Sequence, residues 1–123
     1  LTMKMIPLLK CRNLQAALKF YTEVLDFQLA DPRAAASDLV VLLKNGDAEL
    51  MLTSLEQDQQ TAVAACVLVE NVDALFEKYR SRGLDQSHLV DSPVHLGPVD
   101  QTWGTREFYV TDLEGNTLRY IQR

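Results

Sequence analysis

Apolar residues recur with the spacing of one helix face in two stretches of the chain, offset by 58 residues between Asn13 and Asn71. In both stretches they fall at positions i, i+3, i+4 and i+7, as on an amphipathic helix. They are Leu14, Ala17, Leu18 and Tyr21 in the first stretch, and Val72, Leu75, Phe76 and Tyr79 in the second. The pattern therefore predicts two helices in equivalent places of a repeated unit.

Both predicted helices have start and stop signals. Asn13 and Asn71 each precede the first apolar position, where an asparagine can cap the unpaired N–H groups of a helix start. The second helix reaches Gly83, a common C-terminal residue, whereas the first reaches Asp26, which tolerates the left-handed backbone conformation. The helices are therefore bounded at both ends.

Segments of strand length precede and follow each predicted helix. They are 5–11 and 62–70 before the helices, 38–44 with 48–54 after the first, and 105–111 with 116–122 after the second. Asn45-Gly46 and the turn at 112–115 join the two later pairs as hairpins. Each half is therefore predicted to run from a strand to a helix and then to a strand meander.

A half of about 58 residues with one helix covers one face of a small sheet and is marginally stable by itself. We therefore expect a single domain, 1–123, made of two repeated units at about 3–57 and 60–123. A ferredoxin-like sandwich is the alternative that the pattern permits. The extra hairpin strand in each half argues against that alternative.

Three motifs connect this architecture to a known family. They are FYTEVLDF at 20–27, VENVDALFEKYRSRG at 69–83 and, most specifically, WGTREFYVTDLEGNTLRY at 103–120. The chain from Met5 to Ile121 resembles the glyoxalase, bleomycin resistance and extradiol dioxygenase superfamily, and is most similar to its bleomycin-resistance branch. The resemblance implies an α+β fold of two tandem β-α-β-β-β units, whose curled mixed sheets form a crevice with helices on the outer faces.

Enzymes of that superfamily hold a divalent metal through four side chains, and the resemblance identifies the equivalent positions. They fall at Ile6 or, one residue later, Pro7, and then at Glu49, Ala64 and Arg119. A metal site needs three or four donors, and the guanidinium of Arg119 would oppose a cation. We therefore expect no metal, no cofactor and no catalytic residue.

The same crevice supplies the candidate ligand-binding residues. Glu49 and Arg119 occupy matching strands, so they either contact a polar ligand or pair with each other. Strand alternation predicts an apolar crevice floor of Leu8, Met51, Cys66 and Ile121, and helix-facing side chains at Leu9, Leu50, Leu52, Val67 and Leu118. Such a floor suits a small organic molecule.

Trp103 completes the candidate site. It follows the Pro- and Gly-rich segment 91–102, which we expect to be a binding loop. Stacking on a flat or cationic group would contribute ~0.5–2 kcal/mol. The alternative is that the indole fills the core or a subunit interface.

Two further pairs of polar residues lie near this segment. His88 and His95 are expected to be solvent-exposed loop residues, because no partner for acid–base chemistry stands at a meaningful spacing. Arg106 and Glu107 alternate along one strand, so that at most one of them faces the crevice.

Composition and charge narrow the partners. The chain is 47% hydrophobic and 24% charged, with a net charge of −5, which disfavours nucleic acid and anionic membranes and allows a cationic ligand. We expect a cytoplasmic protein, since no apolar run approaches the ~20 residues of a membrane span and no signal peptide is evident. Cys11 and Cys66, in apolar stretches, are expected to be buried thiols.

These expectations combine into one leading hypothesis. The protein would be a metal-free small-molecule binder similar to bleomycin resistance proteins, a homodimer that sequesters a possibly cationic aromatic drug or metabolite in interface crevices. The first alternative is a metal-dependent glyoxalase- or dioxygenase-like enzyme with atypical ligands. The second is a metabolite-binding module unrelated to resistance.

Overall fold

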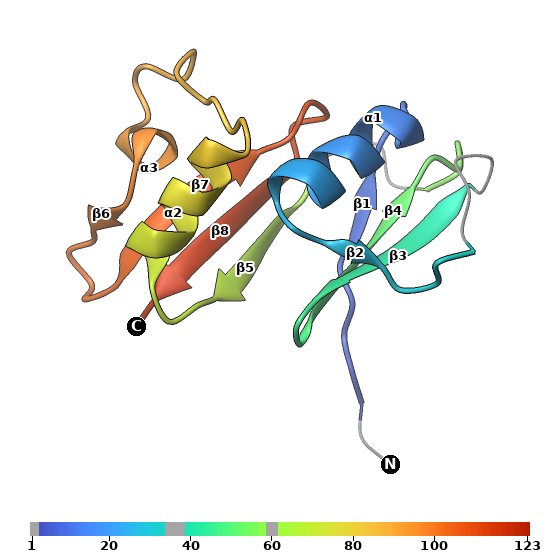
Figure 1. The fold of residues 1–123 in the computed structure, drawn as a ribbon, viewed down its shortest axis with the longest axis horizontal. Coiled ribbons are helices and arrows are strands. Elements are labelled where there is room, and N and C mark those ends of the chain that lie inside the picture. Colours follow the sequence, from blue (N-terminus) through green and yellow to red (C-terminus); the bar gives the residue numbers. More distant parts are fainter. Residues whose placement is uncertain (1–2, 34–38, 59–61) are drawn as a thin grey trace. The chain divides into compact units, whose positions relative to one another are not determined.

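Two four-stranded mixed sheets, each with a helix packed along it, form the described part of the chain (Figure 1). The computed structural model describes residues 3–33, 39–58 and 62–123. Contacts divide the chain into two units, Leu1–Ala62 and Val63–Arg123.

The first unit holds a sheet of strand order β1-β4-β3-β2. Its elements are β1 (Leu8–Lys10), α1 (Leu14–Lys19), the π-helical turn η1 (Phe20–Val24), β2 (Gln28–Leu29), β3 (Val40–Asn45) and β4 (Ala48–Thr53). β1 runs parallel to β4, and the other pairs are antiparallel. The hairpin predicted at Asn45-Gly46 is confirmed, with Asn45 opposite Ala48.

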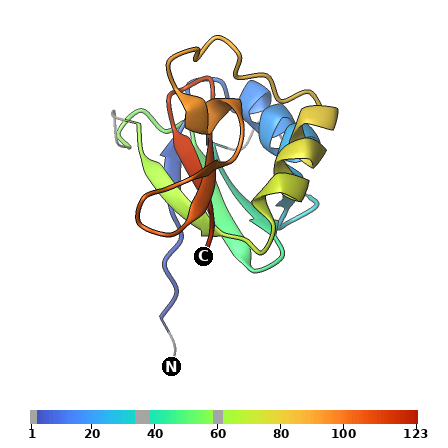
Figure 2. The ribbon, with the colours of Figure 1, turned by 90° about the vertical axis from the view of Figure 1, so that its left-hand side faces the viewer.

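The second unit repeats this topology with the order β5-β8-β7-β6. Its elements are β5 (Ala64–Leu68), α2 (Val72–Ser81), α3 (Pro93–Leu96), β6 (Val99–Asp100), β7 (Arg106–Thr111) and β8 (Thr117–Gln122). β5 is parallel to β8 and the remaining pairs are antiparallel, so the predicted α+β repeat is confirmed. Figures 1 and 2 show α2 lying along one side of this sheet.

The helix boundaries follow the predicted signals. Asn13 and Asn71 accept hydrogen bonds from the backbone N–H groups of Ala16 and Ala74, both at 3.0 Å. Asp26 adopts a left-handed φ of 64° and Gly83 a φ of 106°, which confirms both stops. The π-helical turn after α1 was not predicted, because its apolar spacing matches that of an ordinary helix.

The cap of α2 gives a first testable expectation. Replacing Asn71 with alanine removes the acceptor for the N–H of Ala74, and should lower the free energy of unfolding by about 1 kcal/mol. Urea denaturation measures this loss. Asn71→Ser, which retains a capping oxygen, should keep most of the stability; an equal loss in both variants would contradict the cap assignment.

An aromatic cluster forms the core of the second unit. The rings of Phe108 and Tyr120 stack with centroids 4.8 Å apart. Tyr79 of α2 meets the edges of both rings, and Phe76 meets Phe108 at 5.3 Å. These contacts fasten α2 to one face of β7 and β8, and so define which face of the sheet lies opposite the helix.

Strand alternation follows the prediction in both units. The helix-facing Leu9, Leu50, Leu52 and Leu118 are buried, and Val67 is half-buried. The segment 91–102, predicted as a loop, instead contains α3 and β6. Pro93 at the first turn of α3 explains the difference, because proline fixes a helical φ where its missing N–H costs nothing. None of the helices within the described ranges is long and apolar enough to span a membrane.

Candidate functional site

The face of the second sheet that lies opposite α2 carries most of the candidate ligand-binding side chains of this unit. We call it the open face. It consists of Ala64, Cys66 and Leu68 from β5, Glu107, Tyr109 and Thr111 from β7, and Thr117, Arg119 and Ile121 from β8. The ladder places Tyr109 and Cys66 on either side of Arg119, and Glu107 beside Ile121. Two charges therefore sit among apolar and hydroxyl groups.

Glu107 accepts several hydrogen bonds on the open face, and only 3% of its surface is exposed. Its Oε2 accepts hydrogen bonds from the indole N–H of Trp103, at 3.1 Å, and from the hydroxyl of Thr105. Its Oε1 accepts one from the Tyr109 hydroxyl at 2.9 Å. Burial by itself would raise the pKa of Glu107, but these hydrogen bonds and the nearby Arg119 outweigh it and lower the pKa, so the carboxylate stays ionised.

Trp103 lies in the turn before β7 with 66% of its surface exposed. The alternative in which its indole fills the core is therefore wrong. The hydrogen bond to Glu107 holds the polar edge of the ring while its flat faces remain accessible. A large aromatic surface is thus held in place at the rim of the open face.

Arg119 projects from β8 over a second aromatic ring. Its guanidinium carbon lies 4.8 Å from the centroid of Tyr109, directly across the ladder. Burial and the hydrogen bond to Glu107 raise the pKa of Tyr109, so its hydroxyl remains a donor at neutral pH. Arg119 itself is exposed. The pair therefore presents a fixed cation on an aromatic support.

His95 differs from its predicted place in an exposed loop. It lies in α3, half-buried, with Nδ1 2.6 Å from the Ser92 hydroxyl and Nε2 2.8 Å from the Thr111 hydroxyl. Thr111 in turn shares a hydrogen bond of 2.7 Å with Thr117. Both ring nitrogens are engaged, so His95 ties α3 to the open face. His88 is exposed, as predicted.

The engagement of His95 predicts a pH effect. Burial, and secondarily the charge of His88, lower the pKa of His95 below its ordinary 6.5, so the folded state disfavours the protonated ring. Stability should be complete above pH 6.5 and fall as the pH drops through the lower folded pKa. NMR titration of the ring should give a midpoint below 6.5, and a midpoint above 6.5 would contradict this account.

The remaining predicted residues of the second unit lie on the open face. Ile121 is half-buried there, beside Glu107. Cys66 is exposed, so the expectation of a buried thiol is wrong for this residue, whereas Cys11 is buried as expected. The sequence could not predict the exposure of Cys66, because β5 is uncharged on both faces and so does not show which face is exposed.

The predicted residues of the first unit also share one sheet face. Leu8 of β1 and Met51 of β4 are direct neighbours in the ladder, and both are half-buried. Glu49 forms an ion pair with Lys4. Glu49 and Arg119 therefore each have a partner within their own unit.

Arg106 and Glu107 separate to opposite faces of β7, as their alternation predicted. Arg106 donates to both carboxylate oxygens of Asp73 on α2, at 3.0 and 2.8 Å, and to Asp100 at 3.2 Å. The hydrogen bonds to Asp73 and Asp100 raise the pKa of Arg106. It therefore belongs to the helix side of the sheet.

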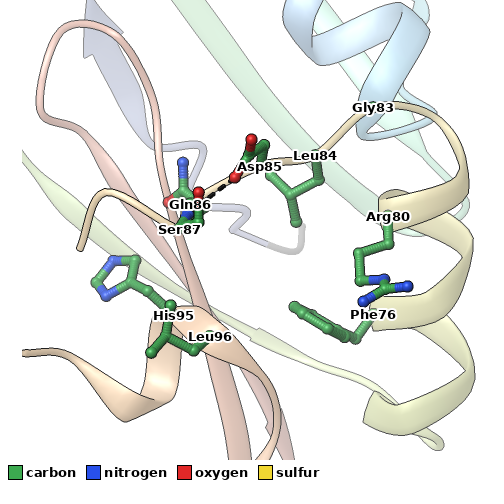
Figure 3. A pocket seen from close by; sticks show the side chains of 9 residues that line it. All are labelled: Phe76, Arg80, Gly83, Leu84, Asp85, Gln86, Ser87, His95 and Leu96. Carbon is green, nitrogen blue, oxygen red and sulfur yellow. Dashed lines mark hydrogen bonds between the residues drawn. The ribbon is translucent and has the colours of Figure 1, made fainter. Parts of the chain in front are cut away.

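A second feature of this unit is a pocket of about 510 Å³ beside α2 and α3 (Figure 3). It is lined by Phe76, Arg80, Gly83, Leu84, Asp85, Gln86, Ser87, His95 and Leu96. The amide of Gln86 is committed to the backbone of Thr111, and the Asp85 carboxylate accepts from the N–H of Ser87 at 2.9 Å. Its charged lining residues, Arg80 and Asp85, have opposite signs.

Comparison with known proteins identifies the family. The model of the Glyoxalase/Bleomycin resistance protein/Dioxygenase superfamily matches residues 7–120. The chain belongs to this superfamily. The resemblance derived from the sequence is thereby confirmed, and a search of the curated proteins gave no match.

Solved structures of this superfamily share the fold along the whole chain. A bleomycin resistance determinant encoded on transposon Tn5 is 21% identical with a TM-score of 0.77, over 99% of this chain and 98% of that one. A bleomycin-binding protein in complex with bleomycin is 21% identical with a TM-score of 0.72, over 99% of both chains. A lactoylglutathione lyase from Agrobacterium tumefaciens is 16% identical with a TM-score of 0.68, over 98% and 93%. Binding proteins and an enzyme thus share this fold.

The four superfamily metal positions do not fit a metal in this chain. Ile6 or Pro7 and Ala64 carry no donor side chain, Glu49 pairs with Lys4, and Arg119 is a cation. Within residues 3–33, 39–58 and 62–123, His, Cys, Asp and Glu form no cluster of three or more that could hold a metal ion. We therefore assign no role to a metal.

Proposed function

We propose that the chain is a metal-free binding protein that sequesters a small aromatic molecule against the open face. The observation that carries this proposal is the exposed ring of Trp103, held by its indole N–H to the buried carboxylate of Glu107. An exposed tryptophan ordinarily loses conformational freedom when a ligand stacks on it. Here that freedom is already restricted, which lowers the cost of binding.

The lining of the open face supports binding over catalysis. A general base needs a ring nitrogen or carboxylate oxygen able to take a proton from a substrate. Both nitrogens of His95 and both carboxylate oxygens of Glu107 are already engaged in hydrogen bonds. The exposed or half-buried Cys66, Leu68 and Ile121 add apolar surface, as in sites that hold small organic ligands.

We further propose that the protein acts as a homodimer with its ligand crevices at the interface. Leu68 lies on the open face with 56% of its surface exposed, and a second copy would remove such apolar surface from water. Sedimentation equilibrium should give twice the chain mass of 13.9 kDa. A single species at the mass of one chain would exclude the dimer.

Calorimetric titration in EDTA tests the binding function. The probe is 2-naphthamide, a flat and uncharged aromatic that isolates stacking from charge. We expect saturable binding that Trp103→Ala weakens by about 2- to 30-fold, from a stacking contribution of ~0.5–2 kcal/mol. The matched control is Leu113→Ala, which removes another apolar residue, 83% exposed in the turn between β7 and β8, and should leave affinity unchanged. Lack of binding, or full affinity in Trp103→Ala, would contradict the proposal.

Metal analysis distinguishes a binding protein from a metal-dependent enzyme. The enzymatic alternative is worth testing because a lactoylglutathione lyase shares this fold. Protein prepared without chelator should contain no stoichiometric Fe, Ni, Zn or Mn, because of the four positions only Glu49 carries a donor and it is paired with Lys4. A metal at one equivalent per chain that survives dialysis would favour the enzyme.

The ligand could be a cationic drug such as bleomycin or a metabolite unrelated to resistance. The net charge of −5 favours a cationic aromatic molecule, and one structural neighbour binds bleomycin. A metabolite unrelated to resistance would use the same surface. Expression in bleomycin-sensitive cells distinguishes these two versions, since drug sequestration predicts increased survival in proportion to protein level.

A further inference from the structure

We propose that the open face selects an aromatic ligand bearing a carboxylate group, and that Arg119 is the residue that recognises this group. This inference rests on the proposed function and gives the ligand class of the same face. It reverses the charge expected from the net charge of the chain.

The side chain of Arg119 is exposed and its N–H groups have no acceptor in the part of the chain that the structure describes. Its contact is with the ring of Tyr109, 4.8 Å below the guanidinium carbon. The contact with the ring is not a hydrogen bond to an acceptor atom, and arginine carries five donors in one plane that can serve a ligand. The group is therefore positioned and unsatisfied.

The negative charge on the same face, the carboxylate of Glu107, differs from Arg119 because it is buried and already hydrogen-bonded. Glu107 is buried, and its two oxygens already accept from Trp103, Thr105 and Tyr109. A ligand cation would have to compete with these three donors for a buried carboxylate, and any donor that it displaced would lose its partner. The guanidinium of Arg119 is therefore more accessible to a ligand anion than the carboxylate of Glu107 is to a ligand cation.

The opposite charge near Arg119 on the open face is the carboxylate of Glu107, whose oxygens are already engaged by other donors. On one side the ladder places Cys66 and on the other Tyr109, whose raised pKa keeps its hydroxyl a donor at neutral pH. Among the residues of the open face, Glu107 and Arg119 are the charged ones. The net charge of −5 is distributed over the whole chain, and charges beyond the Debye length of about 8–10 Å are largely screened. Local chemistry therefore decides the preference.

A carboxylate matches this group in both charge and shape. The planar guanidinium fork binds the two oxygens of a carboxylate through parallel hydrogen bonds, which an amide cannot reproduce and an ammonium opposes. The aromatic part of the same ligand would use the exposed ring surface of Trp103. The two requirements together define an aromatic carboxylic acid.

Three ligands of one shape test the inference: 2-naphthoate, 2-naphthamide and 2-naphthylmethylammonium. Affinities measured by calorimetry at pH 7 and low salt should follow that order, with the carboxylate up to about fivefold tighter than the amide. The carboxylate's advantage should shrink as salt is raised, because a partly exposed charge pair is screened.

Variants of Arg119 and Arg106 test which residue causes the preference for a carboxylate. Arg119→Gln should bring the carboxylate and the amide to equal affinity, and Arg119→Lys should retain part of the preference. The matched control is Arg106→Gln on the same sheet, whose guanidinium is committed to Asp73 and Asp100 on the helix side and which should leave the preference intact. The thermal unfolding profile of each variant verifies that it is folded.

The possible outcomes separate this inference from the proposed function. Equal affinities for the three ligands, a preference for the ammonium, or a carboxylate preference that survives Arg119→Gln would overturn the inference while leaving aromatic binding in place. Failure of all three ligands to bind would overturn the proposed function and the inference together.

Discussion

Replacing Phe108 with alanine should lower the free energy of unfolding by about 3–5 kcal/mol, the largest effect on stability that we expect from one substitution. Phe108 is completely buried, stacks on Tyr120 at 4.8 Å and meets the edges of Phe76 and Tyr79. Its removal leaves a cavity at the junction of β7, β8 and α2. Typical domains are stable by only ~5–15 kcal/mol, so much of the margin would be lost.

Urea denaturation followed by circular dichroism measures this loss. The matched control is Phe20→Ala, the same change at a half-buried ring in the first unit, and it should cost clearly less. A loss below about 1 kcal/mol for Phe108→Ala would mean that the ring is not central to the packing of this unit.

Among substitutions at residues that do not contact the ligand themselves, replacing Glu107 with glutamine should weaken ligand binding the most. The amide keeps the size of the side chain, but presents an N–H₂ group where the carboxylate accepts from Trp103 and Thr105 or from Tyr109. We expect a stability loss of about 1–3 kcal/mol, as for a buried hydrogen bond left unmade. Affinity for 2-naphthamide should fall by up to about 30-fold, the limit set by the stacking contribution.

A double-mutant cycle tests whether Glu107 acts by positioning Trp103. If it does, Glu107→Gln should weaken binding much less in a Trp103→Ala background than in the wild type, because the ring that it positions is gone. Strictly additive effects on affinity would show instead that Glu107 acts independently of Trp103.

The same carboxylate predicts a dependence on acidic pH. Since the folded protein lowers the pKa of Glu107 from an ordinary 4.5, its stabilising contribution is fully present above pH 4.5 and is lost as the pH falls through the folded pKa. The indole N–H resonance of Trp103 should move over this lower range, as protonation weakens its acceptor. A transition centred above pH 4.5 would contradict the assignment.

The fold was predictable because its signals are local. The caps at Asn13 and Asn71 and the turn at Asn45-Gly46 each depend on a few neighbouring residues, and the structure confirms them. Alternation along the strands also placed Leu8 with Met51, since side chains two positions apart share a face. The superfamily resemblance added the pairing of the strands, which periodicity does not determine.

The functional contacts were less predictable, although some signals were available. Thr105, Glu107 and Tyr109 stand two residues apart, which places a carboxylate between two hydroxyl donors on one strand face. The Ser92-Pro93 pair is typical of a helix start and could have indicated α3. The tie between His95 and Thr111 could not be predicted, because it spans sixteen residues and depends on where α3 packs.

The partners of the charged candidates depended on tertiary structure in the same way. Glu49 could be matched with any cation that the fold brings near, and the structure pairs it with Lys4. Arg119 could be matched with any carboxylate, and the structure instead stacks it on Tyr109. That unpredicted contact with a ring, in place of a carboxylate, is the observation on which the proposed role of Arg119 rests.

The most direct test of the central claim is a ¹H–¹⁵N correlation NMR titration of the protein with 2-naphthamide in EDTA. The account predicts saturable shifts at the Trp103 indole N–H, the Arg119 side chain and the backbone amides of Cys66 and Tyr109, all on or beside the open face. Shifts confined to the pocket of Figure 3, at Leu84 and Ser87, or the absence of any shift, would contradict it.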